Sequence, residues 1–145
     1  MMDLGQKVDD VIKLLKEGKR PEYNLIMSLD MSSQDLSGID LSDIKFIDVN
    51  LTKVSLRNCK IHESAFINCN LQEVDFSESD MNAVVFSNDK LFNVEDKISE
   101  VRLTKALFCN ANLINVIFSK CDLQGTDMTG ANLHQVVYEK SFCQS

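Results

Sequence analysis

Large apolar side chains recur at every fifth position along most of this chain. Steps of five from Met31 to Leu91 meet thirteen apolar residues without a break, and a second run of eight extends from Leu103 to Tyr138. The two runs are 12 residues apart, which is two fives plus two residues. The pattern therefore predicts a two-residue insertion within the polar stretch 92–100.

Two further positions share this period. The residue two before each apolar centre is small or β-branched, as at Val54, Cys59 and Ala111, and the residue just before the centre is often Asp or Asn. An α-helix repeats every 3.6 residues and a flat strand every 2, so neither explains a period of five. A solenoid explains it if each five-residue unit forms one short side and then turns, with both apolar positions inside.

The units ANLIN, CDLQG, TDMTG, ANLHQ and QDLSG resemble the A(D/N)LXX units of the pentapeptide-repeat family, over roughly residues 29–140. The resemblance implies an all-β solenoid, a right-handed quadrilateral parallel β-helix with four pentapeptides per coil. It implies about five coils and a rod about 25 Å long at the usual spacing of paired strands.

Four units per coil place residues 20 apart in one column. With the insertion looped out, aromatic rings are expected to form a core ladder, consisting of Phe46, Phe66, Phe86 and Phe108, and continued by Met128. The same geometry points Leu51, Leu71 and Leu91 into the interior. Asn68, Asn88 and Asn110 are expected to stack as an amide ladder at a turn.

The two ends of the expected rod differ. Residues 1–22 are predicted to form an amphipathic capping helix, closed by Gly18 and followed by Pro21, with an apolar face made of Leu4, Val8, Val11, Ile12 and Leu15. The β-helix is expected over 23–140 and a tail over 141–145. Either this tail, with Phe142, covers the last coil, or a second subunit does. Gyrase-protecting members of the family pair through their C-terminal ends, so the resemblance implies a homodimer there.

Composition narrows the partners and the compartment. The net charge is -7 and the pI about 4.7, which argues against direct nucleic-acid binding and fits either a basic partner or simple solubility. No apolar run is long enough to span a membrane, and the charged N-terminus lacks a secretory signal. Five cysteines without a CxxC pair favour a reducing cytoplasm. The alternative location is that of a bacterial effector delivered into a host cell.

Catalytic chemistry has little support in the sequence. His62 and His134 are expected on different faces, and no catalytic motif, metal site or cofactor site is present. Three cysteines occupy the small inward position and two do not: Cys59, Cys69 and Cys121 against Cys109 and Cys143. The acidic group Glu73, Asp75, Glu78 and Asp80 is typical of a solvated face. The chain is therefore expected not to be an enzyme.

One group of outward positions is apolar where polar residues are expected. It lies on the side of the Phe column and comprises Ile47, Ala65, Ile67, Val85 and Leu107, with Ile114, Ile117 and Val137 as a smaller group. Contiguous exposed apolar side chains often mark a partner site. The alternative is that a loop, the tail or the N-terminal helix covers them.

Two functions remain. The first is a non-catalytic protein–protein interaction or scaffold module. The second is a DNA-mimicking protein that binds DNA gyrase or topoisomerase and protects or inhibits it, as the acidic charge allows. Two departures count against this mimic: a rod of only about five coils, and an insertion of only two residues where several members of the family project long loops.

Overall fold

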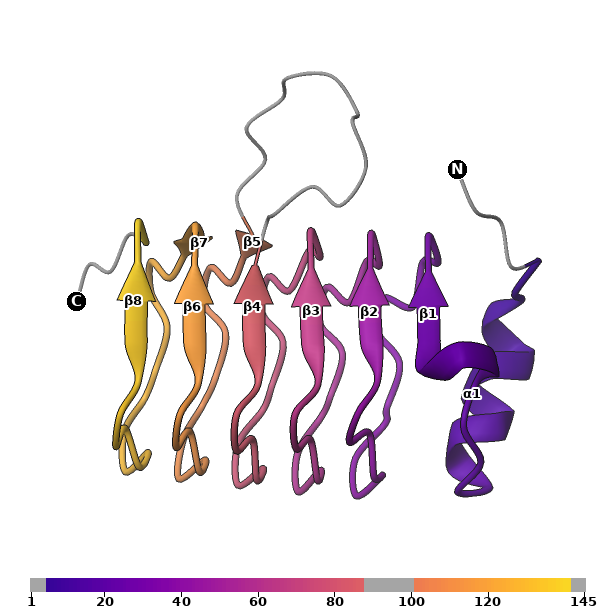
Figure 1. Ribbon diagram of the computed structural model, residues 1–145, viewed down its shortest axis with the longest axis horizontal. Coiled ribbons are helices and arrows are strands. Elements are labelled where there is room, and N and C mark those ends of the chain that lie inside the picture. Colours follow the sequence, from indigo (N-terminus) through magenta and orange to yellow (C-terminus); the bar gives the residue numbers. More distant parts are fainter. Residues whose placement is uncertain (1–4, 88–100, 142–145) are drawn as a thin grey trace.

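The computed structural model describes residues 5–87 and 101–141, and it confirms the expected parallel β-solenoid of about five coils (Figure 1). A short helix closes one end of the rod, and the strands lie side by side along its length. The elements are α1 (Val8–Lys16), η1 (Glu22–Asn24), β1 (Leu25–Met27), β2 (Lys45–Ile47), β3 (Ala65–Ile67), β4 (Val85–Ser87), β5 (Val101–Arg102), β6 (Ile117–Ser119), β7 (Cys121–Asp122) and β8 (Val137–Glu139).

One side of the rod is a six-stranded parallel sheet in the order β1-β2-β3-β4-β6-β8. Phe46 pairs with Phe66 and Phe66 with Phe86, so neighbouring strands here are one coil of 20 residues apart. The other sides are held by isolated parallel bridges such as Asp35 to Ser55 and Asp40 to Lys60. Each coil therefore has four sides, and a residue on one side stacks on the residue 20 positions earlier.

The register changes once, and by more than the sequence predicts. Val85 of β4 pairs with Ile117 of β6, a separation of 32 residues rather than 20. The coil between Ser87 and Val101 therefore contains twelve additional residues, and the prediction of a two-residue insertion is wrong. The expected insertion at 92–100, together with Asn88 and Leu91, lies outside the described residues. The prediction failed because it counted Leu91 as the last centre before Leu103.

Two neighbouring columns of rings fill the interior. Phe46, Phe66 and Phe86 stack at centroid distances of 4.7 and 5.2 Å, and Phe118 continues the column at 5.0 Å from Phe86. Phe108 does not join this ladder, contrary to expectation. It stacks on Phe76 at 5.1 Å in the neighbouring column and meets Phe86 only edge-on, at 6.2 Å. The twelve-residue insertion is the cause, because it rotates every later centre to a different side.

The N-terminal helix seals the first coil. Val11, Ile12 and Leu15 of α1 are buried in the same core as the solenoid, while Leu4 lies outside the described residues. Gly18, at φ 74°, ends the helix with two hydrogen bonds, from Gly18 N to Leu15 O and from Lys19 N to Leu14 O, the paired closure for which glycine is favoured. The Gln6 side-chain amide then donates to Leu25 O at 2.7 Å and accepts from Met27 N at 3.0 Å, so it satisfies the free edge of β1.

The opposite end is open within the described residues. Leu133, Val137 and Tyr138 of the last coil are 42%, 50% and 45% exposed, whereas Leu113 and Phe118 one coil earlier are completely buried. Phe142 and Cys143 lie outside the described residues. No helix in the described part of the chain is long and apolar enough to cross a membrane.

Candidate functional site

The outward side of the six-stranded sheet carries apolar side chains. They flank the buried ring of each strand, because successive residues of a strand point to opposite sides. We call this surface the apolar sheet face, and it consists of Leu25, Ala65, Ile67, Val85, Ile117 and Val137. Lys45 is the one charged residue in the column that also contains Ala65 and Val85. The face is therefore continuous from β3 to β8 and nearly uncharged.

The residues predicted for partner binding divide into three groups. Ala65, Ile67 and Val85 are half-buried and lie together on β3 and β4. Ile47 is only 8% exposed, so its predicted exposure on this surface is wrong. Leu107 is 37% exposed but lies on another side of the rod, bridged to Asp75 and Asp127. Its placement beside the Phe column was wrong for the same reason as that of Phe108.

The corrected register adds two residues to the apolar sheet face. Ile117 pairs with Val85, and Val137 pairs with Ile117, so both continue the column of Ala65. The sequence pattern marked them as apolar but placed them on a different side. Val137 is 50% exposed and lies beside the open end, so the apolar sheet face is continuous with the open last coil.

Two other sides of the rod concentrate the negative charge. We call them the acidic faces, and their carboxylates are Asp35, Asp75, Glu78 and Asp127 on one side and Asp40, Asp43, Glu63 and Asp80 on the next. The described cations on these sides are Arg57 and Lys60. Arg57 donates to Asp75 at 3.1 Å and lies 3.6 Å from Glu78. Most of the net charge of -7 is thus on the acidic faces, away from the apolar sheet face.

Many of these carboxylates have a structural role at the turns. Asp127 accepts from the Thr129 hydroxyl at 2.5 Å and from the Thr129 backbone N–H at 2.9 Å, and these bonds lower the pKa of its carboxyl. Asp35 is similar, because hydrogen bonds from Ser37 lower its pKa. These groups stay ionised at neutral pH, which makes them poor general acids or bases.

The cysteines and histidines do not form a reactive site. Burial raises the pKa of Cys69 to about 12 and also raises that of Cys59, so both thiols are protonated core groups. Cys109 is partly exposed, but desolvation and the nearby Asp127 raise its pKa as well. His62 is held by Asp80 at 2.6 Å, and His134 is exposed elsewhere. Among the described residues no three His, Cys, Asp or Glu side chains lie close enough to hold a metal ion.

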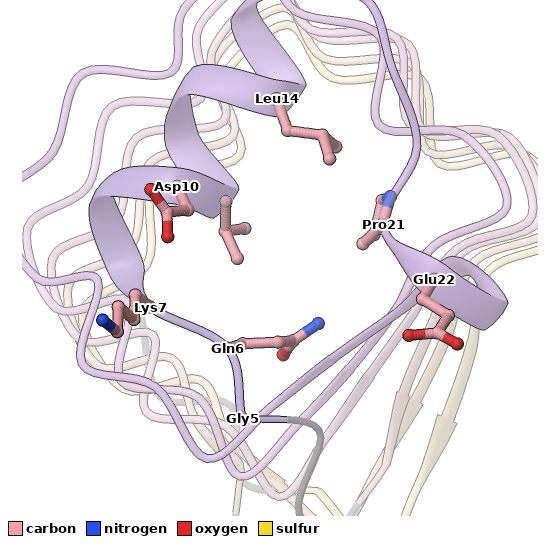
Figure 2. Close-up of a pocket in the computed structure, with 8 residues that line it drawn as sticks. Gly5, Gln6, Lys7, Asp10, Leu14, Pro21 and Glu22 are labelled. Atoms are coloured by element: carbon pink, nitrogen blue, oxygen red, sulfur yellow. The ribbon is translucent and has the colours of Figure 1, made fainter.

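The described residues form a small cavity at the capped end, between α1 and η1 (Figure 2). It has a volume of about 230 Å³ and is lined by side chains such as Val11, Leu14, Pro21 and Glu22. The sequence pattern gave no sign of it, because it depends on how the chain returns after Gly18.

The comparisons with known proteins agree with this architecture. The family described as "Pentapeptide repeat region" matches residues 28–95, and "Pentapeptide repeats (8 copies)" matches residues 97–135. A pentapeptide repeat protein from the Arabidopsis thaliana thylakoid lumen is similar in structure, with 24% identity and a TM-score of 0.61 over 73% of this chain and 66% of that chain. This chain thus spans just under two thirds of that relative.

Two further solved structures show weaker similarity. QnrB1, a plasmid-mediated fluoroquinolone resistance protein, is 18% identical with a TM-score of 0.48 over 74% of this chain and 71% of its own. The protein Rfr23 from the cyanobacterium Cyanothece 51142 is 14% identical with a TM-score of 0.48 over 93% and 94%. No curated protein matches the chain.

Proposed function

Since this chain belongs to the pentapeptide-repeat family, we propose that it is a non-catalytic interaction or scaffold module that binds a protein partner through the apolar sheet face. Pentapeptide-repeat proteins are generally structural or interaction modules rather than enzymes. The observation that carries the proposal is the apolar column Ala65, Val85, Ile117 and Val137, which lies on a face with a single cation.

The chemistry of that face supports a protein partner. A sheet surface with a polar rim and an apolar centre resembles the core of a protein interface, where charged residues are depleted. The described interior is filled by rings and aliphatic side chains with essentially no exposure, so binding takes place on the outside of the rod. The free cysteines Cys59, Cys69, Cys109 and Cys121 fit the cytoplasm as the location, with delivery into a host cell as the alternative.

A pull-down from native lysate tests the apolar sheet face. We expect Ile67→Glu and Val85→Glu each to abolish capture of a partner of defined stoichiometry, because a carboxylate would be desolvated in the interface. Gln72→Glu adds the same charge on a polar side of the rod and serves as the matched control. Equal capture by all three variants would remove the proposal.

The thermal transition separates binding from folding. Ile67 is half-buried, so we expect Ile67→Glu to lower the unfolding temperature only slightly. If it unfolds the protein, Ile67 is a core residue and the test passes to position Ala65. A photo-crosslinking side chain at Ala65 should form an adduct with the partner, and one at Gln72 should not.

A second function is favoured by the acidic faces. Eight carboxylates against two cations on adjoining sides form a surface that suits a basic partner, such as the DNA-binding groove of a topoisomerase. The insertion of twelve residues also removes one of the two departures that the sequence suggested. The test is a gyrase supercoiling assay with and without fluoroquinolone: protection or inhibition at low micromolar protein would favour the mimic, and no effect would exclude it.

We also propose that the open last coil pairs with a second copy of this chain. Leu133, Val137 and Tyr138 are exposed there, and α1 blocks the opposite end, so only a tail-to-tail pair hides this surface. Light scattering should give twice the chain mass of 16.4 kDa, and Leu133→Asp should give the single mass. A single mass for both proteins at high concentration would exclude the dimer.

A further inference from the structure

The cavity at the capped end is the right size for one side chain. Its volume of about 230 Å³ is below the roughly 300 Å³ at which most small-molecule pockets begin. Val11 and Pro21 are buried and Leu14 is half-buried, so its wall is apolar. Figure 2 shows Leu14, Pro21 and Gln6 directed towards the same central space. The Gln6 amide is already bonded to β1, which leaves the apolar wall and the rim to choose an occupant.

The rim of the cavity carries two carboxylates. Asp10 and Glu22 are exposed, and neither has an ion pair or a side-chain hydrogen bond among the described residues. Nearby acids differ, since Glu17 lies 3.1 Å from Lys19 and Asp40 lies 3.3 Å from Arg20. An apolar cavity with carboxylates on its rim complements a side chain with an aliphatic stem and a cationic end.

The residue after Glu22 is strained. Tyr23 has φ 58° and Asn24 has φ 52°, a left-handed conformation that is uncommon for a bulky side chain. Burial of the ring does not compensate for this strain, because Tyr23 is 75% exposed. An exposed tyrosine next to an acidic residue can hold a cation against its ring face.

We propose that the capped end of the rod binds an arginine side chain from a basic segment of a partner protein. The guanidinium pairs with the Glu22 carboxylate and stacks on Tyr23, while the aliphatic stem occupies the cavity between Leu14 and Pro21. Arginine fits better than lysine, because its planar group can pair with a carboxylate and stack on a ring at the same time. This site lies outside the proposed function and does not depend on the apolar sheet face.

The test is a titration of the full chain with acetyl-arginine-amide, followed by backbone and side-chain amide NMR signals. We expect saturable shifts at Gln6, Val11 and Leu14, with a Kd on the order of 1 mM. Acetyl-citrulline-amide has the same shape without the charge and should give no saturable shift. Glu22→Gln should weaken binding about threefold to fivefold. Glu63→Gln removes an exposed carboxylate far along the rod and should leave binding unchanged.

Three results would overturn the proposal. The first is equal binding of the citrulline probe. The second is an arginine response spread over the acidic faces, with Glu22→Gln no weaker than Glu63→Gln. The third is a set of NMR contacts from Leu4 to Val11 and Leu14 in the free protein, which would show that the chain's own N-terminus occupies the cavity.

Discussion

The Ser64 hydroxyl donates a 2.6 Å hydrogen bond to the carbonyl of Leu41, one coil earlier, in the buried core. The same oxygen accepts from Ile44 N at 3.4 Å, so it bridges a turn that does not close on itself. Most other turns close directly, as from Val54 N to Leu51 O at 3.1 Å. Ser79 repeats the bridge, donating to Leu56 O at 2.5 Å and accepting from Cys59 N at 3.0 Å. Inward serines therefore complete the open turns.

Ser64→Ala should destabilise the protein more than its small size suggests. The change leaves the Leu41 carbonyl and the Ile44 N–H buried without a partner, which costs about 1–3 kcal/mol. Chemical denaturation measures the change in the free energy of unfolding. Ser64→Cys should cost less, because the Cys69 thiol makes an equivalent contact to Phe46 O at 3.3 Å. Ser37→Ala, whose hydroxyl contacts only Ser55 at the surface, is the control. Equal losses for Ser64→Ala and Ser37→Ala would refute the bridging role.

Phe66→Ala should be the most damaging single truncation in the core. Phe66 stacks between Phe46 and Phe86 and meets Phe76 edge-on at 5.7 Å, so a cavity there has walls on every side. We expect a loss of about 3–5 kcal/mol in the free energy of unfolding. Tyr138→Ala should cost clearly less, because that ring stacks on Phe118 and is 45% exposed. A Tyr138→Ala variant as unstable as Phe66→Ala would contradict the ladder.

The period of five predicts the solenoid and its buried centres, because inward side chains must be apolar whatever side they occupy. Ile26, Leu51, Leu71 and Phe118 are all completely buried. The side on which a centre lies needs a count modulo twenty across the insertion, and the pattern gives only a count modulo five. Insertions of two, seven or twelve residues leave the same pattern, and this ambiguity misplaced Phe108.

Other features of the candidate site depend on contacts between coils. Ile47 and Ile67 occupy equivalent positions in the repeat, yet Ile47 is buried and Ile67 is half-exposed. The bridging hydroxyl of Ser64 is likewise invisible in the pattern, because serine there appears only as a small residue. The cavity near Glu22 depends on the path of the chain after the helix, which no repeat specifies.

Mild acid should weaken the fold through the turn carboxylates. Hydrogen bonds from Ser32, Ser37 and Thr129 lower the pKa values of Asp30, Asp35 and Asp127 below 3.8. A lowered pKa in the folded state gives stability that is present above the unfolded value and is lost as pH falls through the folded value. The unfolding temperature should therefore fall as pH drops from about 5 towards 3.

Asparagine at the same three positions tests the cause. Asn70 and Asn132 already accept the equivalent turn bonds, from Gln72 N at 3.2 Å and from His134 N at 3.1 Å. The triple Asp→Asn variant of Asp30, Asp35 and Asp127 should keep the fold and show a smaller fall in unfolding temperature over the same pH range. An unchanged pH profile would mean that other groups control the acid response.

Excision of residues 89–100 should leave a folded solenoid. The deletion joins Asn88 to Val101 and returns the separation of Val85 and Ile117 to one coil of 20 residues. Val101 is completely buried and pairs with Cys121, so it already fills the small inward position of its unit. Because loop length changes closure entropy only slowly, we expect an unfolding temperature within a few degrees of the parent. Deleting ten residues, 90–99, shifts the pattern by two and should place polar side chains in the core. Unfolding of the twelve-residue deletion, or a stable ten-residue deletion, would show that the register across this segment is wrong.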